Sequence, residues 1–301
     1  MIKRFTFQFT LSKIQRVFWQ SKFPARKYCI RCHSRSISVI SDGRFLCRRC
    51  RYLFSILTGT LISRSRLPLD AWYELLWWFF YEFTANKAAK ETELPQRLIH
   101  HCFSTIRKAI YDYEEAEMEK FFGIVEVDET CIGPKFKNRR KKERGYLKRM
   151  GVVKRGRGAQ MLLQPVFGMY QRDGEVHIKF ISDIDKKTLQ DIIRGRIDLE
   201  SDVYSDTWKS YKGLTRKGYR HETIDHSKEE YVRDEKIHIN GIEGFWGYLK
   251  ERLLKHHGVA KTNLIYYVKE QEFRFNNRHI STEQMIEKII KIILKSGSSN
   301  D

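Results

Sequence analysis

Two pairs of cysteines near the start of the chain constrain its fold more than any other feature. Cys29 and Cys32 form one C-x-x-C pair, and Cys47 and Cys50 form another after 14 intervening residues. Each pair makes a tight turn that directs two thiolates at one ion, so two pairs supply the four ligands of a closed, structural zinc site. A disulfide framework and a chance pattern are the alternatives, which an intracellular setting and the repeated spacing disfavour. We expect a zinc ribbon over residues 29–60 that depends on Zn²⁺ for its core.

The charge of the chain indicates a polyanionic partner. Its 301 residues include 57 Lys and Arg but 37 Asp and Glu, which gives a net charge of +20. Such a balance says little about the fold but predicts affinity for nucleic acid. The sequence shows no run of 18 apolar residues and no signal-peptide pattern, so we expect no membrane contact. The expected setting is intracellular and DNA-associated, in a bacterial cytoplasm and nucleoid or in a eukaryotic nucleus.

Helical patterns flank the expected ribbon. Residues 1–28 form an N-terminal helix or arm, because Ile14 and Phe18 lie four positions apart in an amphipathic segment. Residues 61–118 form a helical region, in which aromatic side chains recur at helical spacing after Asp70, the expected N-cap.

A possible DNA-binding motif lies inside this helical region. A short helix over residues 87–91, a turn and a longer helix over 95–115 with Arg97, Arg107 and Lys108 are compatible with a helix-turn-helix. An ordinary helical connector whose aromatic side chains fill a core fits equally well, and the sequence leaves both interpretations open.

A short acidic stretch gives the first indication of chemistry. Apolar and acidic residues alternate over residues 124–128, the period of a strand with one face toward a core. Glu126 and Asp128 share one face of this strand, and Glu129 points to the other. Carboxylates this close raise one another's pKa unless a cation lies among them. The stretch is either a solvated acidic edge strand or the first part of a divalent-metal site that downstream acids complete.

The pattern after this stretch predicts a mixed sheet flanked by helices. Strands are expected at residues 162–170, 176–181, 202–206 and 221–224, and helices after Asp185 and His238. Asp128 and Asp206 then each end a strand, and Glu243 lies on the first turn of the last helix. Ligands gather at strand ends in such sheets, so these three acids can converge. Their hard oxygen ligands suit a pair of Mg²⁺ or Mn²⁺ ions in a phosphoryl-transfer site.

A strongly basic segment follows the acidic strand. Residues 135–157 hold 12 basic residues and one acidic residue without periodicity, which predicts an extended loop or arm. A charge run is usually a solvated face, but at this place it would bring nucleic-acid phosphates to the acids.

At this point the chain resembles a known family, the DDE transposases of bacterial insertion sequences that carry an N-terminal zinc ribbon (the ISXO type), and the related eukaryotic Merlin elements. The resemblance runs from about Cys29 to His279. The matching pieces are the ribbon with Phe54-Ser55 and Thr58-Gly59-Thr60, Val127-Asp128-Glu129-Thr130 with Ile132-Gly133, Tyr204 to Tyr211, His226-Ser227-Lys228 with Tyr231-Val232, His238 with Asn240, Glu243-Gly244-Phe245-Trp246, Leu249-Lys250, and Phe275-Asn276-Asn277-Arg278.

The resemblance implies a ribonuclease-H-like α/β catalytic domain over residues 119–280, with a C-terminal helix and tail over 281–301, and cut-and-paste DNA transposition. Carried over by position, Asp128, Asp206 and Glu243 are the catalytic acids that bind Mg²⁺.

Three further residues near these acids bear on the match. Some relatives use Asn as the third residue, and Asn240 lies one helical turn before Glu243, so either can fill that place. His238 is a further catalytic candidate, as a contact to DNA or to the scissile phosphate. Ser205 stands where many relatives have an acid-glycine pair, although the acid at Asp206 is retained.

The expected partners are double-stranded DNA, as transposon terminal repeats and target, and further copies of this chain, because two ends must be cut. The expected DNA contacts are Arg48, Arg49, Arg97, Lys135, Arg139, Arg140, Lys141, Lys142, Arg155, Trp208, Lys209 and Lys250. Two other functions stay open: a ribonuclease-H-like nuclease or resolvase that never joins strands, and a domesticated DNA-binding protein whose acids are vestigial.

Overall fold

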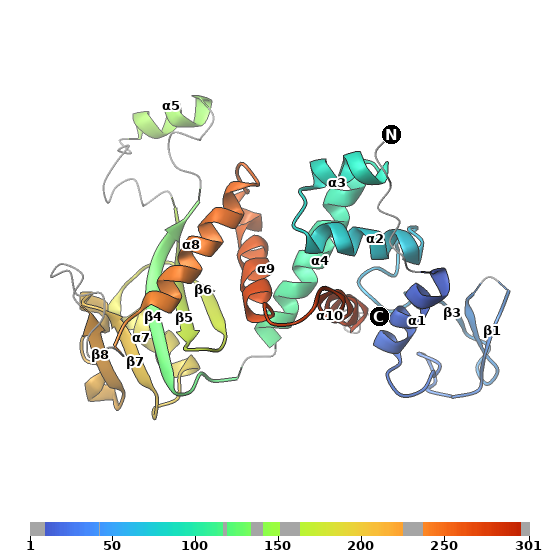
Figure 1. Cartoon of the computed structure of the whole chain (residues 1–301), viewed down its shortest axis with the longest axis horizontal. Helices are drawn as coiled ribbons and strands as arrows, with labels where there is room; N and C mark the ends of the chain where they lie inside the picture. The colour runs from blue at the N-terminus through green and yellow to red at the C-terminus, as the bar shows by residue number, and fades with distance from the viewer. Residues whose placement is uncertain are drawn as a thin grey trace. The chain divides into compact units, whose positions relative to one another are not determined.

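The computed structural model describes residues 10–41, 43–116, 119–133, 141–150, 163–224 and 237–295 (Figure 1). Contacts divide the chain into two compact units, Met1–Ala116 with His279–Asp301, and Glu117–Arg278. Helix α10 (Thr282–Lys295) thus belongs to the first unit although it follows the second in sequence. None of the described helices combines the length and the hydropathy needed to span a membrane.

The first unit begins with a helix joined to a small sheet. Strands β1 (Ile37–Val39), β2 (Phe45–Cys47) and β3 (Leu53–Phe54) pair antiparallel in the order β1-β2-β3. Helix α1 (Leu11–Lys22) buries Ile14 and Phe18, as their spacing predicts. Lys22 Nζ at its end donates to the carbonyl oxygens of Ile56 and Thr58 at 2.6 and 2.5 Å, which ties α1 to the loop after β3.

The rest of the first unit is helical. Helices α2 (Leu69–Phe80) and α4 (Gln96–Ala116) pack with α10, and α3 (Ala85–Thr92) packs against α4. Asp70 does not cap α2 as predicted, because the helix starts earlier and Pro68 occupies the N-cap position. Arg107 is also not a surface cation: it is 4% exposed, and its guanidinium lies 5.3 Å from the ring of Phe79.

The second unit contains the predicted mixed sheet. Its order is β6-β5-β4-β7-β8, with β4–β5 and β5–β6 antiparallel and β4–β7 and β7–β8 parallel. The strands are β4 (Ile124–Ile132), β5 (Gln164–Gln171), β6 (Val176–Phe180), β7 (Asp202–Asp206) and β8 (Arg220–Ile224), and the helices are α5 (Lys141–Arg149), α7 (Lys186–Arg196), α8 (Asn240–Leu254) and α9 (Leu264–Asn276), with 3-10 turns η2 (Lys209–Tyr211), η3 (Thr215–Lys217) and η5 (Lys261–Asn263).

Helices cover both faces of this sheet (Figure 1). Residues of α8 and α9 share one apolar core with Tyr170 and Tyr204, and residues of α7 share the other with Val125 and Val127. Because side chains alternate along a strand, the even-numbered residues of β4 face α8 and the odd-numbered ones face α7. This places Asp128 on the α8 face.

Glycines allow α8 to approach the sheet closely. A Cβ at Gly168 on β5 would lie 2.5 Å from Trp246, and one at Gly241 on α8 would lie 2.2 Å from Tyr170. Neither distance is compatible with a side chain, so the first turns of α8 rest directly on β5.

The basic segment differs from the expected extended arm in its described part. Lys141–Arg149 forms helix α5, in which Leu147 is buried among exposed basic side chains. One buried apolar residue gives no periodicity, so the sequence did not reveal this helix. Residues 135, 139, 140 and 155, and the matching pieces over 226–232, lie outside the described residues.

Side chains of α9 protect the sheet edge formed by β6. Asn276 Oδ1 accepts the Val176 N–H at 2.8 Å, and its Nδ2 donates to the Val176 carbonyl at 2.9 Å. Glu272 Oε2 accepts the Ile178 N–H at 3.0 Å. These contacts occupy strand groups that would otherwise be open to pairing with another chain, and they give Asn276 of the matching sequence pieces a structural role.

Replacing Asn276 by Ala should therefore destabilise the protein. Two buried backbone groups of Val176 would lose their partner, at a cost of about 2–4 kcal/mol in the free energy of unfolding. Urea denaturation measures this loss of stability. The control is Asn263→Ala, because the Asn263 side chain is exposed and makes no capping hydrogen bond to α9. Equal stability of the two variants would contradict the assigned role.

Candidate active site

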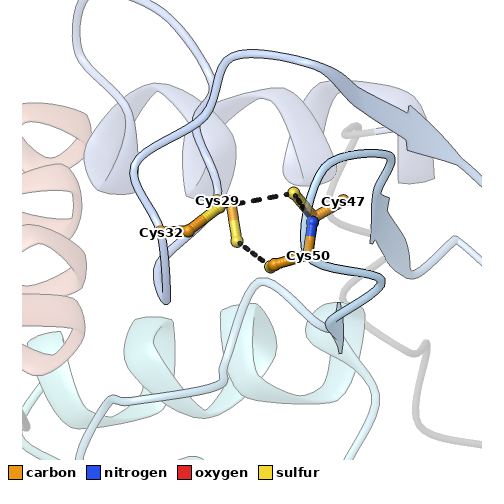
Figure 2. Close-up of side chains that lie close together, drawn as sticks. All are labelled: Cys29, Cys32, Cys47 and Cys50. Atoms are coloured by element: carbon orange, nitrogen blue, oxygen red, sulfur yellow. Dashed lines mark hydrogen bonds between the residues drawn. The ribbon is translucent and has the colours of Figure 1, made fainter.

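The four ribbon cysteines converge at one point (Figure 2). Their sulfur atoms all lie within 4.8 Å of one another, and the Cys29–Cys50 and Cys32–Cys47 pairs are each 3.6 Å apart. Sulfurs around a tetrahedral zinc ion at 2.3 Å lie about 3.8 Å apart. The cluster can therefore hold a metal ion, and its geometry and four soft ligands are compatible with structural zinc.

The two cysteine turns repeat one backbone pattern. His33 N–H donates to the Cys29 carbonyl at 2.9 Å, and Arg51 N–H donates to the Cys47 carbonyl at 3.0 Å. His33 and Arg51 both have positive φ, 56° and 57°. Each turn thus closes with a left-handed residue directly after its second cysteine.

The predicted acids Asp128 and Asp206 lie at one level of the sheet. The parallel register of β4 and β7 pairs Glu126 with Tyr204. Asp128 lies two residues after Glu126, and Asp206 lies two residues after Tyr204. Both residues face α8, because they keep the parity of Glu126 and Tyr204. Asp206 ends β7 as predicted, but Asp128 does not end β4, because that strand continues to Ile132 in its pairing with β5. The structure thus brings the two acids to one level of neighbouring strands.

The surroundings of Asp128 disfavour its charge. Burial and the nearby charges of Glu129 and Asp206 raise the pKa of Asp128 to about 7, although the Trp246 indole N–H donates to its Oδ2 at 2.9 Å. A cation among these carboxylates would restore the ionised form. The donor set suits Mg²⁺ or Mn²⁺, which prefer carboxylate oxygens.

Glu129 joins this cluster from the other face of β4. Burial and the charge of Asp206 raise its pKa, and the Tyr211 hydroxyl donates to its Oε2. Burial and the charge of Glu129 raise the pKa of Tyr211 well above its usual range, so the hydroxyl keeps its proton. The sequence stretch indicated Glu129, and Tyr211 belongs to one of the matching sequence pieces, but no local pattern predicted that these two side chains would meet.

Glu243 lies on the first turn of α8, as predicted. It precedes Trp246 by three positions, so it lies on nearly the same side of the helix as the indole that contacts Asp128. Glu243 and Asn240 are both exposed. Among the residues that the structure describes, the acids Asp128, Asp206 and Glu243 do not close to within 4.8 Å as the cysteines do.

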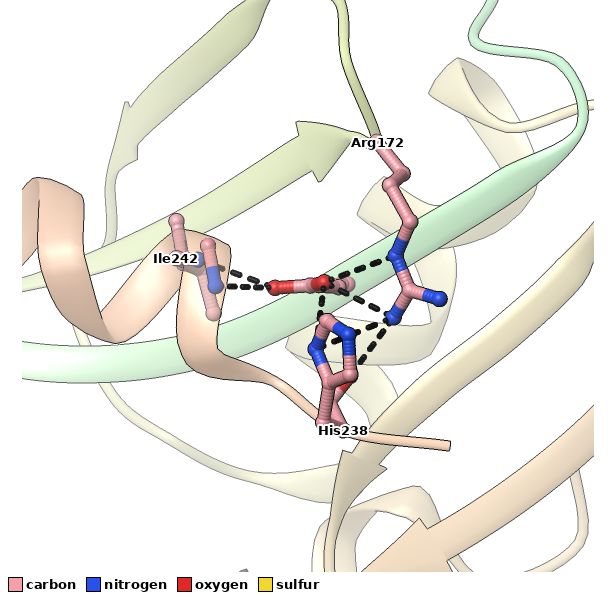
Figure 3. Close-up of polar contacts among 5 residues, drawn as sticks. Arg172, His238 and Ile242 are labelled. Atoms are coloured by element: carbon pink, nitrogen blue, oxygen red, sulfur yellow. Dashed lines mark hydrogen bonds and ion pairs between the residues drawn. The ribbon is translucent and has the colours of Figure 1, made fainter. Parts of the chain in front are cut away.

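His238 lies against a different carboxylate, that of Glu126 (Figure 3). Its Nδ1 is 3.3 Å from Glu126 Oε1 and 3.2 Å from Arg172 Nη2. Glu126 is fully buried and also accepts from the backbone N–H groups of Gly241 and Ile242. Arg172 directly follows β5 in the turn before β6, and no local sequence pattern predicts its contact with Glu126.

The described candidates for DNA contact occupy several surfaces. Exposed side chains are Arg48 and Arg49 in the second cysteine turn, Arg97 on α4, Lys141 and Lys142 on α5, Trp208 and Lys209 after β7, and Lys250 on α8. The Trp208 N–H donates to Asp206 Oδ1 at 2.8 Å, which orients that acid. Lys250 lines a cavity of about 820 Å³ with Cys131 at the end of β4.

Replacing Cys47 by Ser should remove zinc from the protein. We expect about one zinc ion per wild-type chain and almost none in the variant, because three thiolates leave the tetrahedral set incomplete. Elemental analysis after gel filtration measures the content, with Cys102→Ala as control, since Cys102 lies in α4. Undiminished zinc in Cys47→Ser would exclude this site.

The pKa of Asp128 predicts how stability depends on pH without Mg²⁺ or Mn²⁺. The native carboxyl holds its proton up to about pH 7, whereas the unfolded chain releases it near pH 4. The folded state thus binds more protons in this window, and the free energy of unfolding falls as the pH rises, by up to on the order of 4 kcal/mol.

Asp128→Asn should flatten this dependence and stabilise the protein at pH 7.5. Urea denaturation at pH 4.5 and 7.5 measures the difference, and Asp191→Asn, an exposed change on α7, is the control. If the free energy of unfolding of Asp128→Asn fell with pH as steeply as that of the wild type, a group other than Asp128 would cause the pH dependence.

Comparison with known proteins identifies the family. The ISXO2-like transposase domain matches residues 120–276, more than half of the 301 residues. An uncharacterized transposase-like protein of Haemophilus influenzae is 33% identical over 118 residues, which cover 39% of this chain and 94% of that protein. An uncharacterized protein in the transposable element ISH50 of Halobacterium salinarum is 26% identical over 256 residues, 82% of this chain and 84% of that one. The chain belongs to the ISXO2-like transposase family.

Proposed function

We propose that this transposase cuts phosphodiester bonds at transposon ends and transfers the freed 3′-OH strand into target DNA, with a ribonuclease-H-like catalytic unit. The observation that carries the proposal is the placement of Asp128 and Asp206 at one level of neighbouring parallel strands, on the sheet face that α8 covers. The mixed sheet with order β6-β5-β4-β7-β8 supports the ribonuclease-H-like assignment.

Asp128, Asp206 and Glu243 would hold two Mg²⁺ or Mn²⁺ ions. When bound, such a pair supplies charge for the attacking and the leaving oxygen of the phosphodiester. The protein's own part is to orient these acids: the Trp246 indole fixes Asp128, and the Trp208 N–H fixes Asp206. Asn240, one turn before Glu243, and His238 are adjacent groups that would contact the reacting DNA.

Glu243 is the preferred third acid because a carboxylate brings charge to the metal. Asn240 supplies a neutral oxygen at a comparable place on α8.

The first unit would bind the terminal repeats. Its ribbon carries Arg48 and Arg49 on the surface, and the first half of α4 exposes polar side chains suited to base edges and phosphates. These are Gln96, Arg97, His100, His101 and Ser104. Helix α5, with Lys141 and Lys142, would hold flanking or target DNA through phosphate contacts. Two copies of the chain would act together, because a transposon has two ends.

Substitution of the acids tests the catalytic assignment. Asp128→Asn, Asp206→Asn and Glu243→Gln should each lower Mg²⁺-dependent cleavage of end DNA by at least about a hundredfold, because each removes a charged ligand. Binding of end DNA should change little. A gel-based cleavage assay and a binding titration measure the two, with Glu175→Gln, an exposed acid between β5 and β6, as control.

Cleavage that persists in the Asp128 and Asp206 variants would contradict the assignment. Strand joining is tested separately with pre-cleaved ends and a target plasmid. Joined products support a transposase reaction, whereas cleavage without joining would indicate a nuclease of the same fold.

A further inference from the structure

We propose that Glu126 is a positioning residue that fixes the first turn of α8, and with it Glu243, relative to Asp128 and Asp206; this inference rests on the proposed function of those acids. Glu126 lies two residues before Asp128 on the same face of β4. Its carboxylate is fully buried, and each of its contacts joins β4 to another part of the site.

The beginning of α8 depends on this carboxylate. The first four N–H groups of a helix have no partner within the helix, and a polar N-cap side chain normally accepts from one of them. In α8 the N-cap residue is Ile239, which has no such side chain. Glu126 Oε2 accepts instead from Gly241 N–H at 2.8 Å and from Ile242 N–H at 3.0 Å. A residue from a distant strand thus supplies the cap.

Arg172 balances the buried charge of Glu126. Its Nη2 and Nε donate to Glu126 Oε1 at 2.9 and 3.2 Å, and Nη2 also donates to the His238 carbonyl at 3.0 Å (Figure 3). The same guanidinium lies 5.2 Å from the ring of Tyr204 in β7. Arg172 therefore connects the segment before α8 with β4 and with the strand that ends in Asp206.

The cap and the ion pair together link the three elements that carry the proposed acids. Asp128 is on β4, Asp206 on β7 and Glu243 on the turn that Glu126 caps. The close approach at Gly241, where a Cβ would lie 2.8 Å from Glu126 Oε2, leaves the helix start little freedom to shift while the bond is intact. Groups that orient ligands in this way affect metal affinity or activity about 10–100-fold.

Two double variants isolate the cap. Glu126→Met with Arg172→Met replaces the buried ion pair by apolar side chains of similar length, which often leaves stability nearly unchanged, but it removes the acceptor for Gly241 and Ile242. Glu126→Gln with Arg172→Met keeps a carbonyl oxygen at that place. Asp202→Asn with Arg220→Met is the matched control, because it removes a partly exposed ion pair of the same sheet, with a distance of 2.6 Å.

Three readouts are compared between the two double variants. The Met/Met variant should show at least tenfold faster hydrogen exchange at Gly241 and Ile242, a Mn²⁺ dissociation constant raised about 10–100-fold, and a similar loss in the cleavage rate at saturating DNA, with the affinity for DNA within about twofold. The Gln/Met variant should recover most of each loss, and the surface control should match the wild type in exchange and Mn²⁺ binding.

Equal exchange and equal Mn²⁺ binding in the two double variants would overturn the positioning role. Neither readout requires DNA cleavage, so this result is distinct from failure of the proposed function. A wild-type protein that binds Mn²⁺ through the three acids but leaves end DNA intact would contradict the function, while the exchange and binding data still decide the role of Glu126.

Discussion

The buried carboxylate of Glu126 is the interaction on which the candidate site depends. It gives β4 a hydrogen-bonded connection to the start of α8, and Arg172 provides the positive charge that makes its burial acceptable. An isolated carboxylate in this place would favour its neutral form or remain hydrated. Glycine at position 241 is required for the same reason, since a side chain there would meet Tyr170 and the carboxylate itself.

The electrostatic environment of Asp128 and Glu129 differs from that of Glu126. Asp128 receives a neutral indole N–H and Glu129 a neutral hydroxyl, and neither donor offsets the charge as a guanidinium does. Their repulsion and burial raise the pKa of Asp128 to about 7. Two residues apart on one strand, Glu126 contacts a guanidinium whereas Asp128 contacts a neutral donor, which is the arrangement that the proposed metal site requires. This contrast favours a metal site over a solvated acidic edge, because β4 is the central strand of the sheet.

Sequence reasoning predicted the features that depend on local pattern. Alternation over residues 124–128 placed Glu126 and Asp128 on one face, the C-x-x-C spacing predicted the cysteine cluster, and β7 begins and ends at the expected residues. Features that depend on distant contacts had no such signal. Nothing local indicated that Arg172 binds Glu126, that Arg107 of the possible helix-turn-helix is buried, or that the polar α9 residue Asn276 pairs with β6. The long-range cap of α8 belongs to the same class, because its donor and acceptor are 115 positions apart.

The most direct test of the account is to locate Mn²⁺ by anomalous scattering in crystals of the protein grown with the ion and end DNA. The account predicts anomalous density between the middle of β4 and the end of β7, coordinated by Asp128, Asp206 and Glu243, with Glu126 still bonded to the start of α8. Density coordinated by Glu126 itself, or Mn²⁺ held by Asp128 and Glu129 without any residue of α8, would contradict it.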